Sequence, residues 1–183
     1  SNCKMVRLPH PILNNTQLDI LCNIRYKGFN TIKLSLAHPQ PLPKGGESDY
    51  HQAGENLRMA LDRLCKDAEK AVDDGYNYII LTDKVTESPS LGEGLGWAFI
   101  PSLLAVSAVH HYLISVGKRV QTALIVESGE VWETMHAALL LGYGASALCP
   151  YMTFAILDDL VKRHKIQEDY ATAEANYIKA VKK

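Results

Sequence analysis

The sequence predicts an α/β fold in which helices alternate with the strands of a mainly parallel sheet. Two apolar runs rich in β-forming residues, 76–83 and 120–126, are expected to be strands buried on both faces, as parallel strands are. Each follows a helical pattern that a glycine ends, at Gly75 and at Gly117. Strands that alternate with helices imply parallel neighbours joined by right-handed crossovers.

The first half of the chain contains one short and one long helical pattern. A short helix is expected at residues 16–26, ended by Gly28, and a strand at 31–36, where apolar and polar residues alternate. Residues 38–54 hold three prolines and three glycines and are expected to form a loop. The clearest helix is predicted at 55–74, because its apolar residues fall on one stripe.

The second half continues the alternation after a loop expected at 84–99. Helices are predicted at 102–116, 130–141, 152–164 and 170–182, and a short strand at 145–150. The strand–helix units amount to half of a (β/α)8 barrel or to a small doubly wound sheet, and the pattern fits both. In either case a site would lie at the C-terminal ends of the strands, here residues 37–38, 82–84, 127–129 and 149–150.

The composition indicates a single globular domain and excludes several classes of function. The 183 residues are 47% hydrophobic and 21% charged, with a net charge of -1. This balance gives no broad attraction for nucleic acid or anionic lipid. No apolar run is as long as a membrane span, and no signal-peptide pattern is present. We therefore expect a cytoplasmic protein, or a plastid one in a photosynthetic eukaryote, without nucleic-acid or membrane partners.

The cysteines do not form a metal-binding pattern. Cys3, Cys22, Cys65 and Cys149 are widely spaced, with no C-x-x-C pair, so a zinc site is not expected. Cys22 and Cys65 lie among apolar residues at helical spacing. Both are expected to be reduced and buried, because a free cysteine packs as a small hydrophobic residue.

The segment "VESGEVWETMH" (126–136) is the most prominent candidate site. A strand ends there in Glu127, and Ser128 or Gly129 would serve as the N-cap of the following helix. Glu127, Glu130 and Glu133 would already supply negative charge at that helix N-terminus, which argues against a phosphate site. Either an ordinary strand-to-helix joint or a specific partner contact fits this pattern.

The same segment contains the spacing Glu133-x-x-His136, which is also that of di-metal carboxylate proteins. Such sites need a second copy on another helix, and the sequence has none. His136 is instead expected to pair with Glu133 or to lie over Trp132. His110, on an apolar helical stripe, is expected to be a buried, hydrogen-bonded structural histidine rather than a catalytic one.

Two glycine-rich stretches are weak candidates for phosphate binding. "LGEGLGW" (91–97) departs from the dinucleotide fingerprint in spacing and does not follow a strand directly, and "KGGES" (44–48) is a flexible turn. A rival hypothesis remains open, in which the chain is an independent small-molecule or anion-binding enzyme domain. Its site would gather His38, Asp83, Glu127 and His136 around one mouth at the strand ends.

Five long strings of the sequence are more specific than fold patterns: "LPHPIL" (8–13), "LDRLCKDAEKAVDDGYNYIILTD" (61–83), "IPSLLAVSAVHHYLI" (100–114), "LIVESGEVWETMHAALLLGYGASALCPY" (124–151) and "ANYIKAVKK" (175–183). In this order they resemble the central domain of the glutamate synthase large subunit. In that family, the central domain is similar to a degenerate relative of the FMN-binding (β/α)8 barrel and binds no FMN. The loops at 38–54 and 85–99 depart from the family pattern.

The resemblance implies a non-catalytic role within a larger enzyme. The family's glutaminase region releases ammonia from glutamine, and its synthase region, with FMN and an iron–sulfur cluster, makes glutamate from 2-oxoglutarate. We expect residues 1–183 to be the C-terminal part of the domain between them, with the amidotransferase and FMN-binding domains of the same polypeptide as partners. Residues 1–2 are expected to be a cloning remnant, and 170–183 to begin the connection to the FMN domain.

The resemblance transfers no functional residue to this chain. No catalytic, cofactor-binding or metal-binding residue is expected within it, and no cofactor of its own. Cys3 should not inherit the role of the family's N-terminal nucleophile. Glu127, Ser128, Gly129, Glu130 and His136 are kept as candidates for contact with a neighbouring domain.

Overall fold

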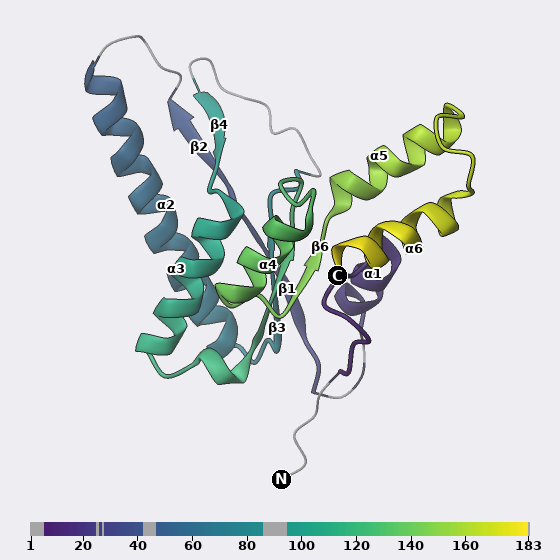
Figure 1. The fold of residues 1–183 in the computed structure, drawn as a ribbon. Helices are drawn as coiled ribbons and strands as arrows, with labels where there is room; N and C mark the ends of the chain where they lie inside the picture. The colour runs from purple at the N-terminus through teal and green to yellow at the C-terminus, as the bar shows by residue number, and fades with distance from the viewer. Residues whose placement is uncertain (1–5, 25, 27, 42–46, 86–94, 183) are drawn as a thin grey trace.

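The fold is built on a four-stranded parallel sheet. The computed structural model describes residues 6–24, 26, 28–41, 47–85 and 95–182. The strands lie in the order β1 (Thr31–Ser35), β3 (Tyr78–Thr82), β5 (Ala123–Glu127) and β6 (Ala147–Cys149) (Figure 1). The α/β class and the parallel sheet predicted from the sequence are confirmed.

Three helices cover one face of this sheet: α2 (Glu47–Asp73), α3 (Ser102–Ser115) and α4 (Thr134–Gly142). Side chains alternate between the two faces of a strand, so Ile79 and Leu81 of β3 point toward these helices. They form the main core with Leu124 and Val126 of β5 and with apolar residues of all three helices. α2 ends at Asp73, and Gly75 stops it as predicted: the glycine has a φ of +86°, and the N–H of Tyr76 donates to the carbonyl of Ala71.

The opposite face is closed by α1 (Asn15–Cys22) and the segment before it. Leu18 and Leu21 of α1 and the preceding Leu13 pack on Ile80 and Ile125 there. Asn14 begins the helix with a capping box, accepting from the N–H of Gln17 at 2.9 Å. The helix ends at Cys22 with Asn23 as its C-cap, so the predicted extension to Tyr26 and stop at Gly28 are wrong.

The strand order favours a partial barrel over a doubly wound sheet. Consecutive parallel strands are neighbours, and the helix after each of β1, β3 and β5 returns over the same face. Successive units of a (β/α)8 barrel are arranged in this way, whereas a doubly wound sheet reverses its order and carries helices on both faces. The face that a complete barrel would turn inward is the one that α1 covers.

The N-terminal segment pairs with β6, on the side of β6 away from β5. Ile12 forms a parallel bridge with Leu148. The N–H of Leu13 donates to the carbonyl of Leu148, and the N–H of Leu148 to that of Pro11, both at 2.7 Å. This edge of the sheet is therefore paired over the length of the bridge rather than open.

Two last helices, α5 (Tyr151–Lys162) and α6 (Tyr170–Val181), lie beside each other after β6 (Figure 1). Phe154 of α5 and Tyr177 of α6 meet edge to face, with ring centroids 5.8 Å apart. Asn14 donates to Glu174 of α6 at 2.7 Å, which ties the start of α1 to the last helix. Within the described residues, no helix is long and apolar enough to cross a membrane.

Both predicted loops contain regular structure. β2 (Ala37–Pro41) and β4 (Leu95–Phe99) form an antiparallel two-stranded ribbon apart from the main sheet. α2 begins at Glu47 rather than at residue 55. The loop predictions were wrong at these positions, because prolines and glycines were given more weight than the tertiary pairing that fixes an edge ribbon. Residues 42–46 and 86–94, which include Lys44 and most of "LGEGLGW", lie outside the described residues.

Candidate functional site

The C-terminal ends of β3 and β5 meet through a closed network of hydrogen bonds around Asp83. The Asp83 carboxylate accepts from the hydroxyl of Ser128 at 2.6 Å and from the N–H of Gly129 at 3.0 Å. Ser128 Oγ in turn accepts from the N–H of Glu130 at 3.0 Å. Burial, followed by the negative charge of Asp83, raises the pKa of Tyr151 to about 12, so this phenol is neutral. The backbone and hydroxyl donors of the predicted "ESGE" site thus bind a carboxylate of the same domain.

Glu127 points away from this network, into the face that α1 covers. It lies two residues after Ile125 in the same strand, so its side chain is on the same face as Ile125. Its carboxylate, only 4% exposed, accepts from the ammonium of Lys33 at 2.8 Å. Partial burial lowers the pKa of Lys33, but the hydrogen bond and charge of Glu127 outweigh it, and the net pKa is raised. Glu127 is therefore held in an ion pair across the sheet.

Glu130 caps a different helix from the one predicted. Its carboxylate accepts from the N–H of Ser102 at 2.8 Å and from the Ser102 hydroxyl at 2.5 Å, at the first residue of α3. α4 begins only at Thr134, with Glu133 in the N-cap position and no side-chain cap. The prediction that Ser128 or Gly129 would cap a helix from residue 130 is wrong. The buried Val131 and the Glu130–Ser102 contact keep this stretch outside the helix.

His136 behaves as the sequence predicted, as a local partner of Glu133. The two side chains approach to 3.7 Å, and His136 Nδ1 accepts from the N–H of Trp132 at 3.2 Å. Among the described residues, no three His, Cys, Asp or Glu side chains are close enough to hold a metal ion. His136 and Glu130 instead line a hollow of about 210 Å³ between α3 and α4, together with Ser102, Leu103, Leu139 and Leu140.

The four residues of the rival hypothesis do not gather around one mouth. Asp83 and Glu127 are neighbours, with the Asp83 N–H donating to the Glu127 carbonyl at 3.3 Å. The Glu127 side chain nevertheless faces α1, while His136 lies on α4, against the opposite face of the sheet. His38 is buried on β2, in the separate antiparallel ribbon. Sequence position alone placed them at strand ends, but side-chain alternation and the ribbon separate them.

A second cluster joins α3 to the turn after α4. The Arg119 side chain donates to His110 Nδ1 at 2.9 Å, to the carbonyl of Thr122 at 2.7 Å and to the carbonyl of Gly144 at 2.7 Å. Burial, then the charge of Arg119, lowers the pKa of His110. His110 is thus a hydrogen-bonded structural histidine, as predicted, although it is half-buried rather than enclosed.

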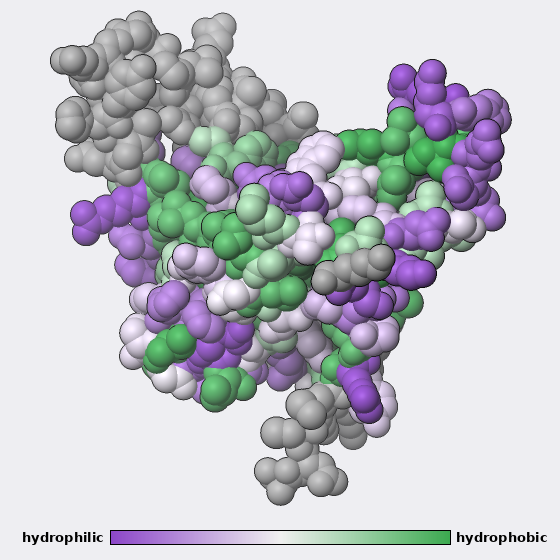
Figure 2. Space-filling model, in the orientation of Figure 1, coloured by the Kyte–Doolittle hydropathy of each residue, from purple (hydrophilic) through white to green (hydrophobic). Residues whose placement is uncertain are grey.

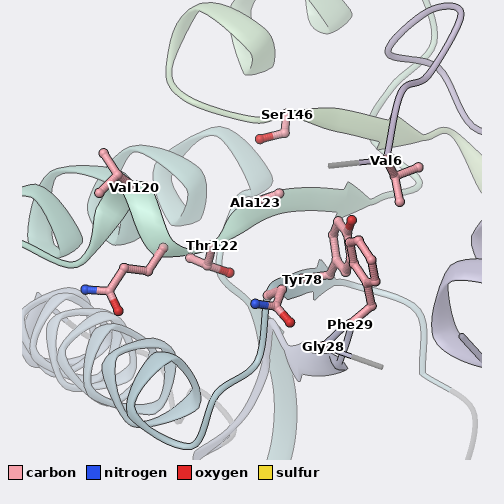
Figure 3. Close-up of a pocket in the computed structure, with 10 residues that line it drawn as sticks. Val6, Gly28, Phe29, Tyr78, Val120, Thr122, Ala123 and Ser146 are labelled. Carbon is pink, nitrogen blue, oxygen red and sulfur yellow. The ribbon is translucent and has the colours of Figure 1, made fainter. Parts of the chain in front are cut away.

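A further hollow, which no sequence pattern indicated, lies at the opposite end of the strands. It holds about 550 Å³ and opens near the N-terminal ends of β3, β5 and β6 (Figure 3). Phe29 and Tyr78 stack in its wall, with ring centroids 5.8 Å apart. None of its lining residues carries a carboxylate, ammonium or guanidinium group, and the N-terminal end of such strands is generally associated with stability rather than catalysis.

Together these features define a class: an α/β domain of partial-barrel type whose strand ends are occupied by its own side chains. The family model of the glutamate synthase central domain matches residues 1–183. The chain therefore belongs to the glutamate synthase central domain family, as the resemblance predicted.

Curated relatives agree with this assignment. The chain is 35% identical over 198 residues to ferredoxin-dependent glutamate synthase 2 of Synechocystis, covering 98% of this chain and 11% of the relative. It is 32% identical over 180 residues to the glutamate synthase [NADPH] large chain of Bacillus subtilis, covering 98% of this chain and 10% of that relative. A ferredoxin-dependent glutamate synthase of Cyanidium caldarium is 37% identical over 153 residues, covering 83% and 9%. The chain thus spans about a tenth of the length of these relatives.

Proposed function

We propose that this chain is a non-catalytic domain that holds the amidotransferase and FMN/iron–sulfur synthase domains of a glutamate synthase polypeptide in register. Glutamate formation from glutamine and 2-oxoglutarate would take place in those neighbouring domains. Residues 170–183, which include α6, would lead toward the synthase domain, and the polypeptide would act in the cytoplasm or a plastid. The observation that carries the proposal is the closed network at the strand ends, where Asp83 occupies the donors of Ser128 and Gly129.

The same network does not fit a flavin phosphate. A phosphate at the C-terminal ends of parallel strands needs free backbone N–H groups or a cation. Here the N–H of Gly129 is bonded to Asp83, and the ammonium of Lys33 is paired with Glu127. The ammonium of Lys84, the residue after Asp83, lies over the Tyr151 ring, 5.3 Å from its centroid, and the Asp83 carboxylate already occupies the donors of Ser128 and Gly129. FMN and the iron–sulfur cluster are accordingly assigned to other parts of the polypeptide.

Of the proposed contact residues, Gly129, Glu130 and His136 are the accessible ones. Glu127 and Ser128 are 3% and 0% exposed, so they would act by positioning the turn rather than by touching a neighbour. Glu130 and His136 lie at the hollow between α3 and α4, where a side chain of a neighbouring domain could be received.

The experiment compares the 183-residue chain with the full-length polypeptide that contains it. The chain alone should show no glutaminase activity, no glutamate synthesis and no flavin absorbance, and flavin or phosphate esters should leave its melting temperature unchanged. Purification of the chain with stoichiometric FMN would refute the proposal. In the full-length enzyme, His136→Ala should raise the ratio of ammonia released to glutamate formed, and an unchanged ratio would remove His136 from the contact.

A further inference from the structure

Two surface helices of this domain have no acidic residue, lysine or arginine. α3 (Ser102–Ser115) and α4 (Thr134–Gly142) contain no Asp, Glu, Lys or Arg. Each buries one side in the main core, yet each also has a side turned away from it. A surface helix normally carries charged residues on its outer side, and a helix that is apolar all round is normally buried all round. The composition of α3 and α4 is therefore that of covered helices.

The outer side of α4 is a continuous apolar stripe. Its residues recur at intervals of three and four positions, which places them on one side of the helix and its preceding turn. Their exposed fractions are 49% for Trp132, 58% for Met135, 40% for Leu139 and 46% for Tyr143. Large aromatic and aliphatic side chains are thus in water on this side, while Ala137 and Leu140 face the core.

The stripe continues toward α3 across the hollow of about 210 Å³. Leu139 belongs both to the stripe and to the wall of that hollow, which Leu103 completes from α3. Leu104 and Ile114 of α3 are themselves 39% and 53% exposed. Hydrophobic residues reach the surface over α3 and α4 in the view of Figure 2. We call this surface the α3–α4 face, made up of Leu104, Ile114, Trp132, Met135, Leu139 and Tyr143.

We propose that the α3–α4 face is a docking surface for an uncharged, apolar segment of the same full-length polypeptide. The proposal rests on the proposed function and names the surface through which that function is exercised. The relatives are about ten times longer than this chain, and covalent linkage keeps their other segments at high local concentration. No charged side chain of either helix offers an ion pair, so the recognition is by apolar burial, as in permanent interfaces.

Hydrogen–deuterium exchange on the full-length polypeptide and on the 183-residue chain tests this proposal. Peptides from α4 and from its preceding turn should exchange at least about tenfold more slowly in the full-length polypeptide, because docking must be broken before the helix opens. Peptides from α2, whose Met59 side chain is 69% exposed, serve as the internal reference. Their exchange rates should change less between the two proteins. Equal exchange of α4 in the two proteins would overturn the proposal.

A matched pair of variants separates docking from folding. Met135→Lys with Leu139→Lys places two cations on the α3–α4 face, and Met59→Lys is the control on α2. In the 183-residue chain, all should melt within about 2 °C of the parent, as exposed substitutions do. In the full-length polypeptide, only the Met135/Leu139 variant should lose the slow exchange of α4; protection that survives this variant refutes the docking surface.

Two further readouts keep the alternatives apart. If the 183-residue chain forms dimers in analytical ultracentrifugation and the Met135/Leu139 variant abolishes them, the occupant is a second copy and the proposal is wrong. The flavin and activity measurements on the chain test the proposed function separately. A flavin-free, inactive chain whose α4 exchanges equally in both proteins would refute the docking surface and leave the proposed function standing.

Discussion

Replacing Gly144 by alanine should destabilise the domain more than the same replacement at Gly75 or Gly117, the other positive-φ turn glycines whose surroundings are described. Gly144 has a φ of +113°, and a Cβ built there would lie 2.2 Å from Nδ1 of His110. The backbone strain alone costs about 1–2 kcal/mol. The imidazole must also move, which breaks its bond from Arg119 at 2.9 Å, a loss of about 1.5–3 kcal/mol for a hydrogen bond to a charged group. The free energy of unfolding should fall by roughly 2.5–5 kcal/mol.

Gly117 provides the matched control for this prediction. It also has a positive φ, +72°, but a Cβ there meets nothing within 4 Å. Gly117→Ala should therefore lose only the strain of about 1–2 kcal/mol. Urea denaturation followed by circular dichroism measures the free energy of unfolding of both variants. If Gly144→Ala loses no more than Gly117→Ala, the clash with His110 is not real. His110→Ala in the Gly144→Ala background should be less destabilising than the two single losses added, because the clash and the bond share one ring.

Three other predictions concern ionisable groups. Lys33→Met should lower the free energy of unfolding, measured by urea denaturation, by about 2–3 kcal/mol, because it leaves the buried Glu127 carboxylate unpaired. Adding Glu127→Gln should restore most of that loss. A smaller effect of Lys33→Met alone would contradict the ion pair. The pKa of His110 is lowered from 6.5 in the folded protein. The contribution of the neutral His110 to stability is therefore fully present above pH 6.5 and is lost as the pH falls toward the lower pKa of the folded state. Between pH 8 and 5, the melting temperature should fall less in His110→Gln than in the parent. Burial raises the pKa of the Cys149 thiol to about 12, so iodoacetamide at pH 8 should modify it only after unfolding, and mass spectrometry that finds rapid native labelling would disprove its enclosure.

The parts of the fold that local patterns determine were predictable from the sequence. The runs that became β3 and β5 are apolar over consecutive residues, which is typical of strands covered on both faces, and glycines at 75 and 117 mark the ends of α2 and α3. The ribbon of β2 and β4 was not predictable in this way, since Pro39, Pro41 and Gly96 disfavour strands locally. Antiparallel pairing between two distant segments, rather than propensity, makes it regular.

The candidate site shows the same division between local and long-range causes. The Glu133–His136 pair follows from helical spacing and was predicted. The partners of Glu127 and Glu130 were not, because Lys33 and Ser102 are 94 and 28 positions away and no local rule connects them. The start of α4 was misplaced for that reason: an acid that looks like a first-turn residue of its own helix instead caps another one.

The pairing of the N-terminal segment with β6 bears on how the domain is made. Asn14 reaches Glu174 across 160 positions of sequence, and Ile12 pairs with Leu148 in the sheet. Contacts so far apart close late, because the intervening chain loses its freedom before they form. During synthesis, residues 11–14 leave the ribosome long before Leu148 and Glu174 do. Until residues 11–14 pair with the newly made β6, that strand has an unpaired edge to which another chain could add. The pairing of residues 11–13 with Leu148 thus covers the edge of the sheet at which another chain could otherwise add a strand.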